Sequence, residues 1–133
     1  MNEFHHFLRT RRSVRRFRLD PVPASVVDRI LATAVHAPSA HNLQPWRFAT
    51  VQKKINRKKL GEALTKKMQT DMRADGTDQA EIDKRVMISL RRIDEAPLII
   101  LLCRDMDAIR KEKPEEVAMG VQSVAIAGLQ ILL

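Results

Sequence analysis

Two short segments of the chain concentrate side chains that can do chemistry. The first is Arg-Arg-Ser-Val-Arg-Arg-Phe at residues 11–17. Arginine makes bidentate, charge-assisted hydrogen bonds to phosphate, and serine adds a neutral donor. If the segment is extended, Arg11, Ser13 and Arg15 share one face and can grip a single anion. The alternative is an ordinary solvated basic face, or a patch that binds nucleic acid.

The second segment is Ala-Pro-Ser-Ala-His-Asn-Leu-Gln-Pro-Trp-Arg-Phe at residues 37–48. It reads as a loop between a helix and a strand, and such loops often carry binding residues. Ser39, Asn42 and Gln44 can pair with the carbonyl and N–H edge of a flat heterocycle, while Trp46 anchors the loop in the core. The alternative is a loop whose Asn and Ser side chains only bond their own backbone.

The elements that position these segments form an α+β pattern with more helix than strand. Apolar residues at helical spacing predict helices at 3–10, 24–36, 57–72, 79–93 and 114–133. Alternation predicts a strand at 47–52, and a short run of branched apolar residues predicts a buried strand at 98–103. We expect Cys103 to be a small buried hydrophobe. The last helix is apolar nearly all round, so we expect it to be buried on several sides, either within the chain or between subunits.

Together the two segments resemble the FMN-dependent nitroreductase family. RRSVRRF is similar to the family's arginine-serine flavin-phosphate motif, and PSAHNLQPW is similar to its PS-x-x-N-x-QPW motif. The order, the spacing and the lone tryptophan make the match specific, and the likeness continues into MGVQSV at 119–124. The resemblance implies a nitroreductase-like α+β fold, with helices around a small, mainly antiparallel sheet. It also implies a homodimer with FMN at the subunit interface.

The resemblance further implies roles for individual residues. Those that would hold the FMN phosphate and ribityl chain are Arg11, Arg12, Ser13 and Arg15, with backbone contacts from Val14. Those that would approach the isoalloxazine ring or its ribityl arm, in the family typically from the partner subunit, are Pro38, Ser39, Asn42 and Gln44. The family transfers hydride from a reduced nicotinamide, NAD(P)H, or a reduced deazaflavin to FMN and then to a small acceptor. Because the flavin does this chemistry, no catalytic side chain is expected.

Within the family, three sequence segments are similar to the nitroreductase-like domain associated with the coenzyme F-420 glutamate ligase: APSAHN, MRADG and MGVQSVAIAG. That likeness implies a reductase acting on a (hetero)aromatic coenzyme F-420 precursor. It places Asp71 where that branch contacts its substrate. An anionic substrate suits the net charge of +8.

Length and composition limit the class of protein and the cellular compartment that the sequence predicts. The chain has 133 residues, of which 44% are hydrophobic and 30% charged. These values favour one domain over residues 1–133 and exclude collagen, coiled-coil fibre and wholesale disorder. The single cysteine excludes an intrachain disulfide and indicates a reducing compartment. No apolar run has the roughly 18 residues of a membrane span, and the start lacks the apolar core of a signal peptide. We therefore expect a cytoplasmic protein with no membrane partner.

Two kinds of ligand are not expected. The histidines form no i, i+4 pair, and no C-x-x-C motif occurs, so no metal site is predicted. Four phenylalanines, one tryptophan and no tyrosine offer few stacking platforms for nucleic acid. A basic nucleic-acid-binding module stays an alternative, and a steep salt dependence of DNA binding would favour it.

The end of the chain carries another expectation. The sequence stops inside an apolar helix without a C-cap glycine, and two strands do not make a stable sheet. Members of the resembled family usually run to about two hundred residues. We therefore expect a C-terminally truncated chain, or further strands from another chain. A non-catalytic remnant that binds flavin or dimerises is accordingly a second functional hypothesis, which flavin occupancy would separate from the enzyme.

Overall fold

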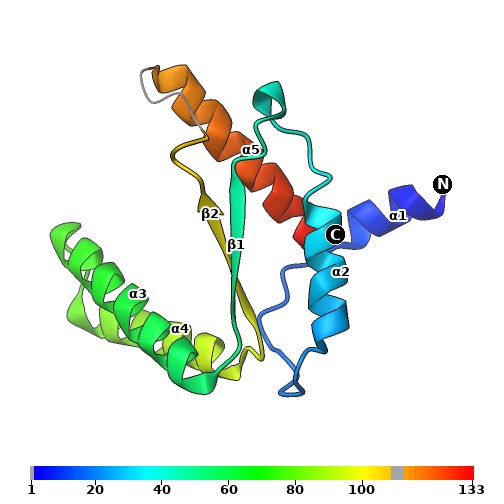
Figure 1. Cartoon of the computed structure of the whole chain (residues 1–133). Coiled ribbons are helices and arrows are strands. Elements are labelled where there is room, and N and C mark those ends of the chain that lie inside the picture. The colour runs from blue at the N-terminus through cyan, green and yellow to red at the C-terminus, as the bar shows by residue number, and fades with distance from the viewer. Residues whose placement is uncertain (1, 109–112) are drawn as a thin grey trace. The chain divides into compact units, whose positions relative to one another are not determined.

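The computed structural model of the chain describes residues 2–108 and 113–133. Its elements in chain order (Figure 1) are α1 (Glu3–Thr10), α2 (Ala24–Ala34), the 3-10 turn η1 (Ala40–Asn42), β1 (Trp46–Val51), α3 (Lys54–Ala74), α4 (Gln79–Glu95), β2 (Ile99–Arg104) and α5 (Pro114–Leu132). The predicted helices and strands are all present, and most of their ends shift by one to three residues. The α+β class is confirmed.

The chain divides into two compact units. The first comprises Met1–Ser13, Val22–Ala49 and Ile100–Leu133, and the second comprises Val14–Pro21 and Thr50–Ile99. The prediction of one domain over 1–133 therefore stays a prediction.

In the first unit, α2 packs against α5 around a small core. Ala37, Trp46 and Ala127 form its buried centre, with Phe48 and Val124 packed against them. Trp46 keeps only 5% of its surface exposed, so the prediction that it anchors the loop before it is confirmed. Small residues let α5 come close to its neighbours: a Cβ added to Gly128 would lie 2.9 Å from Leu102 Cδ2 in β2.

The sheet has two strands, β1 and β2, which run antiparallel (Figure 1). The ladder is extended beyond β2 by a 2.7 Å hydrogen bond from the Asp105 N–H to the Pro45 carbonyl. The prediction of a buried strand at 98–103 is wrong, because no residue of β2 is buried. Cys103 is likewise exposed rather than a buried hydrophobe. A two-stranded sheet leaves each strand with an unpaired edge, so an apolar run is not enough to bury it.

Helix α5 is buried on one side within the described chain, and its predicted burial between subunits stays a prediction. Gly120, Ser123 and Ala127 lie three and four residues apart and form its one buried face. Val121 and Leu132 lie elsewhere on the helix and are 54% and 63% exposed. The reason is that the first unit covers α5 mainly with α2 and η1.

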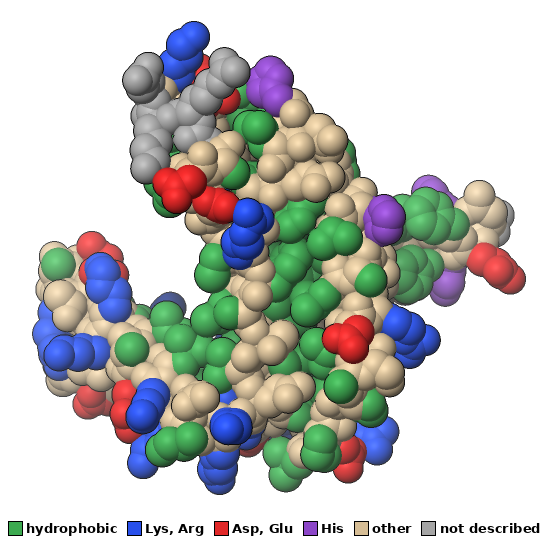
Figure 2. All heavy atoms as spheres, viewed as in Figure 1, with side chains coloured by type: hydrophobic (Ala, Val, Ile, Leu, Met, Phe, Trp, Pro, Cys, Tyr) green, Lys and Arg blue, Asp and Glu red, His purple; other side chains and the backbone are tan. Residues whose placement is uncertain are grey.

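The second unit is built on an antiparallel hairpin of α3 and α4. Gly76, with a φ of +73°, makes the turn after α3, and the Asp78 carboxylate caps α4 by accepting from the Ala80 N–H at 3.0 Å. Ile82 is fully buried in this unit. Figure 2 shows Lys and Arg side chains spread over the visible surface of these two helices. Among the described residues, no helix is both long and apolar enough to cross a membrane.

Candidate functional site

The loop from Pro38 to Gln44 has an unusual backbone. His41, Asn42 and Gln44 have φ angles of 52°, 54° and 47°, which is the left-handed region that residues with a side chain rarely adopt. Asn and His tolerate this region better than most residues, but Gln has no special preference for it. Such backbone geometry persists only where surrounding contacts hold it, and it concentrates at binding sites.

Hydrogen bonds inside the loop hold part of this geometry. The N–H of Asn42 donates to the Ser39 carbonyl at 3.1 Å, and the N–H of Leu43 donates to the Ala40 carbonyl at 3.0 Å. The Ser39 hydroxyl accepts from the N–H of Gln44 at 3.0 Å. Ser39 therefore makes the bond to its own loop that the alternative interpretation expects, and its predicted contact with the flavin stays a prediction.

A single buried hydroxyl ties the loop to α5. Ser123 is 3% exposed, and its Oγ accepts from the Ala40 N–H at 3.1 Å. The same hydroxyl donates to the Met119 carbonyl at 2.8 Å, so both its donor and its acceptor capacity are used. The start of η1 is therefore fixed to a residue that lies far away in the chain.

The side chains of Asn42 and Gln44 form an exposed amide pair. Gln44 Nε2 donates to Asn42 Oδ1 at 3.1 Å. This bond leaves the side-chain oxygen of Gln44, Oε1, and the side-chain NH₂ of Asn42 without a hydrogen-bond partner among the described residues. Pro38 is exposed and Ser39 half-buried at the beginning of the same loop. The structure thus brings the four predicted residues of the second segment together, with an acceptor and a donor turned to solvent.

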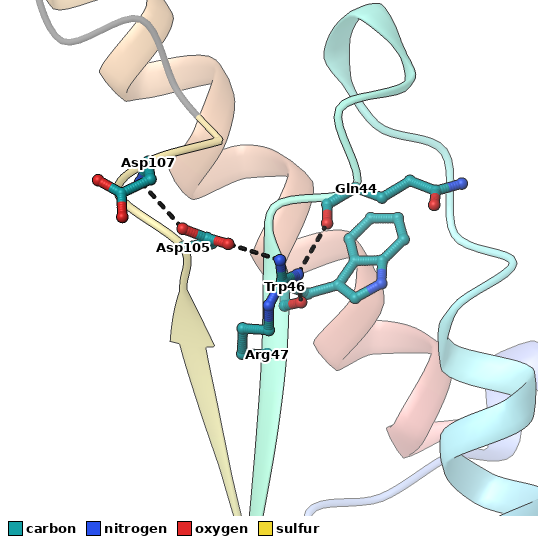
Figure 3. A network of polar contacts seen from close by, with 5 residues as sticks. All are labelled: Gln44, Trp46, Arg47, Asp105 and Asp107. Atoms are coloured by element: carbon teal, nitrogen blue, oxygen red, sulfur yellow. Dashed lines mark hydrogen bonds and ion pairs between the residues drawn. The ribbon is translucent and has the colours of Figure 1, made fainter.

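An ion pair fixes the exit of the loop (Figure 3). Arg47 Nη2 lies 2.5 Å from Asp105 Oδ2, and Arg47 Nη1 donates to the Trp46 carbonyl at 2.8 Å and to the Gln44 carbonyl at 3.5 Å. The other oxygen of Asp105 accepts from the Asp107 N–H at 2.9 Å. The ends of β1 and β2 are therefore joined by side chains as well as by the backbone.

The basic segment has no regular secondary structure between residues 11 and 19, and all its side chains are exposed. Arg12 Nη1 donates to the carbonyls of Arg9 at 3.1 Å and Arg11 at 2.9 Å, which folds this side chain back over the end of α1. The boundary between the two units falls between Ser13 and Val14. The joint grip of Arg11, Ser13 and Arg15 on one phosphate therefore stays a prediction.

Asp71, the predicted substrate contact, lies in the second unit near the end of α3. Its side chain is 53% exposed and pairs with Lys67 one helical turn earlier. This pair is an ordinary i, i+4 interaction, and it leaves the substrate role of Asp71 a prediction.

Sequence reasoning missed three residues that fix the loop: Ser123, Arg47 and Asp105. The signal for Ser123 was available, since a lone hydroxyl on an almost wholly apolar helix needs a buried partner. For the other two there was no local signal, because 58 positions separate them in the chain. No group of three or more His, Cys, Asp or Glu side chains able to hold a metal occurs among residues 2–108 and 113–133.

Comparison with known proteins identifies the family to which the chain belongs. Residues 8–133 match the model of the nitroreductase family. The chain belongs to this family, as its two segments indicated, and its α+β fold is nitroreductase-like. The structure of a hypothetical oxidoreductase, YcnD from Bacillus subtilis, superposes with a TM-score of 0.68 at 26% identity, covering 99% of this chain and 49% of that one.

Other relatives fit the same family. A Desulfovibrio desulfuricans protein in complex with FMN has the same fold, with a TM-score of 0.71 at 24% identity over 99% of this chain and 61% of that one. An NADH dehydrogenase of Thermus thermophilus is 32% identical over 112 residues, and a 5,6-dimethylbenzimidazole synthase of Rhodobacter capsulatus is 36% identical over 91 residues. The matches cover 84% and 68% of this chain and 43% of each relative. The chain thus spans less than half the length of these curated relatives.

Proposed function

We propose that this chain works as an FMN-dependent oxidoreductase. When bound, the flavin would accept hydride from a reduced nicotinamide or deazaflavin and pass it to a small aromatic or heteroaromatic acceptor. Membership of the nitroreductase family and the likeness to an NADH dehydrogenase support this proposal.

The observation that carries the proposal is the rigid polar loop at residues 38–44. Its three left-handed residues, its bond to Ser123 and the Arg47–Asp105 pair hold an amide donor and an amide acceptor toward solvent before any ligand arrives. The edge of an isoalloxazine ring alternates carbonyl and N–H groups, so it can pair with both amides at once. A loop held in its binding geometry loses little conformational entropy on binding.

The basic segment would bind the phosphate of FMN, whose ring the loop at residues 38–44 would approach from the partner subunit. Arg11, Arg12 and Arg15 carry guanidinium groups that bind phosphate in a bidentate manner, and Ser13 supplies a hydroxyl donor. All four side chains are exposed, and Val14 between them offers backbone donors rather than side-chain chemistry. The donor set therefore fits the phosphate of FMN.

The substrate and the assembly are parts of the same proposal. The net charge of +8 suits an anionic acceptor, such as a phosphate- and glutamate-bearing coenzyme F-420 precursor, with Asp71 near it. A homodimer would cover the apolar residues that α5 exposes, including Val121, Leu129 and Leu132. Analytical ultracentrifugation tests this assembly, and a chain that stays monomeric over the whole accessible concentration range would contradict it.

A comparison of FMN with riboflavin tests the proposed phosphate site. The two flavins share the ring and the ribityl chain and differ only in the phosphate. We expect FMN to bind about a hundredfold more tightly, because a bidentate arginine–phosphate contact is worth about 1.5–3 kcal/mol. Replacing both Arg11 and Arg15 with alanine should abolish this difference and leave riboflavin affinity unchanged.

The matched control removes two other arginines of the same segment. Arg16→Ala with Arg18→Ala changes the net charge equally, and Arg18 is already paired with Asp20 at 2.9 Å. This variant should retain FMN. If both double variants lose FMN alike, general charge rather than a phosphate site holds the cofactor. If the unaltered chain binds neither flavin, this result would support the hypothesis of a non-catalytic remnant instead.

A further inference from the structure

A hollow of about 310 Å³ lies on the α3–α4 hairpin, apart from the residues discussed so far. All of its lining residues belong to the second unit, so the hairpin alone defines its geometry. Met68 on α3 and Ile88 on α4 give it an apolar part. The volume is within the range of small-molecule pockets, near its lower end.

Three cationic side chains of α4 line this hollow: Lys84, Arg85 and Arg92. One carboxylate, that of Glu81, also lines the hollow; it accepts from Arg85 Nε at 2.7 Å and lies 4.0 Å from Lys84 Nζ. Arg92 forms no ion pair with any carboxylate of the described residues, although its neighbour Arg91 lies 4.0 Å from Glu95. The hollow therefore carries more positive than negative charge, and an anion would be attracted to it.

A hydroxyl adds a neutral donor to the same wall. Ser89 is half-buried and lines the hollow on the same helix face as Arg85, four residues earlier, and Arg92, three residues later. Five other helical hydroxyls bond the carbonyl four residues earlier, namely those of Thr10, Thr33, Thr65, Thr70 and Ser123. The hydroxyl of Ser89 makes no hydrogen bond to any residue that the structure describes, so its donor is available to a ligand.

We propose that this hollow binds a phosphate monoester attached to an apolar group. Two guanidinium groups and a hydroxyl on one helix face match the several oxygens of a phosphate dianion, which a monoanionic carboxylate does not offer. Met68 and Ile88 would contact the apolar part of the ligand. The site consists of residues other than those proposed for FMN, so this proposal does not depend on the flavin proposal.

Phenyl phosphate is the probe that combines both features. Titrated into the full chain labelled with ¹³C at the methionine methyls, it should shift the Met68 signal in a saturable way, together with the amide signals of Ser89 and Arg92. Met68→Leu, a volume-conserving change, assigns the methyl signal. Inorganic phosphate should bind more weakly because it lacks the ring, and benzoate because it has one negative charge. Benzoate binding as tightly as phenyl phosphate would overturn the assignment to phosphate.

Adjacent arginines provide the matched variants. Arg92→Gln should weaken phenyl phosphate binding about tenfold, as expected for the loss of one charge-assisted contact. Arg91→Gln removes the same charge next to it but outside the hollow, and it should change the affinity less than about twofold. Ser89→Ala should weaken binding about threefold.

Circular dichroism confirms that each variant keeps its helices. Equal losses in Arg91→Gln and Arg92→Gln would show unspecific attraction and overturn the site, as would no saturable shift at Met68. FMN affinity, measured separately, should be the same in all these variants. A failed phosphate site thus remains distinguishable from a failed flavin site.

Discussion

Replacing Ser123 with alanine removes the hydroxyl that ties the loop at residues 38–44 to α5. The hydroxyl is 3% exposed and accepts the Ala40 N–H at 3.1 Å, so the substitution leaves that part-buried N–H without its partner. An unsatisfied buried donor costs about 1–3 kcal/mol, whereas loss of the bond to the Met119 carbonyl is almost neutral. We therefore expect about 2 kcal/mol less stability, which for a chain of this length lowers Tm by about 8 °C.

Thermal unfolding followed by the fluorescence of Trp46 measures this loss, because Trp46 is the only tryptophan and lies in the same core. Thr33→Val is the control: its hydroxyl also bonds the carbonyl four residues earlier, at 2.9 Å, but holds no second group. Hydrogen exchange at the Ala40 amide reports the bond itself and should accelerate only in Ser123→Ala. If the two variants unfold at the same temperature and Ala40 stays protected, the reasoning about this anchor is refuted.

Three other features give predictions of their own. In a double-mutant cycle with Arg47→Met and Asp105→Asn, measured by urea unfolding, we expect a coupling free energy of about 0.5–1 kcal/mol that becomes smaller at high salt. A coupling free energy of zero would show that the ion pair does not stabilise the fold. The hydrogen bond from Arg85 holds the pKa of Glu81 below its usual range. The pair therefore stabilises the folded state at a pH above the unfolded-state pKa of Glu81, and this stabilisation is lost as the pH falls through the folded-state pKa. Carboxyl NMR should show a higher Glu81 pKa in Arg85→Gln, and an unchanged pKa would contradict the cause. Gly76→Ala should cost about 1 kcal/mol through its φ of +73° alone, since no atom lies within 4 Å of the added Cβ; a neutral result in urea unfolding would refute this.

The secondary structure was accessible from the sequence because its signals are local. Helical periodicity located α3 and α4, alternation located β1, and the Pro-Glu-Glu start located α5. Burial was less accessible. The apolar run of β2 was interpreted as a buried strand, but burial depends on how many strands and layers surround it, which no local pattern encodes.

The candidate site likewise has features that local sequence signals predict and features that only the structure shows. The polar side chains of residues 38–44 and the burial of Trp46 were predictable from residue types. The left-handed conformations were not, because the loop contains no glycine that would mark them. The bond from Ala40 to Ser123 joins residues 83 positions apart, and contacts of that kind are set by the packing of α5 rather than by spacing. Loop chemistry was therefore readable from the sequence, while loop geometry required the structure.

The most direct test of the proposed function is the visible absorbance of the purified chain after FMN has been added and the excess dialysed away. We expect about one bound flavin per chain, and anaerobic addition of NADH or NADPH should bleach the yellow colour as the flavin is reduced. A chain that dialyses colourless would contradict the proposal, as would a bound flavin that neither a nicotinamide nor a reduced deazaflavin reduces.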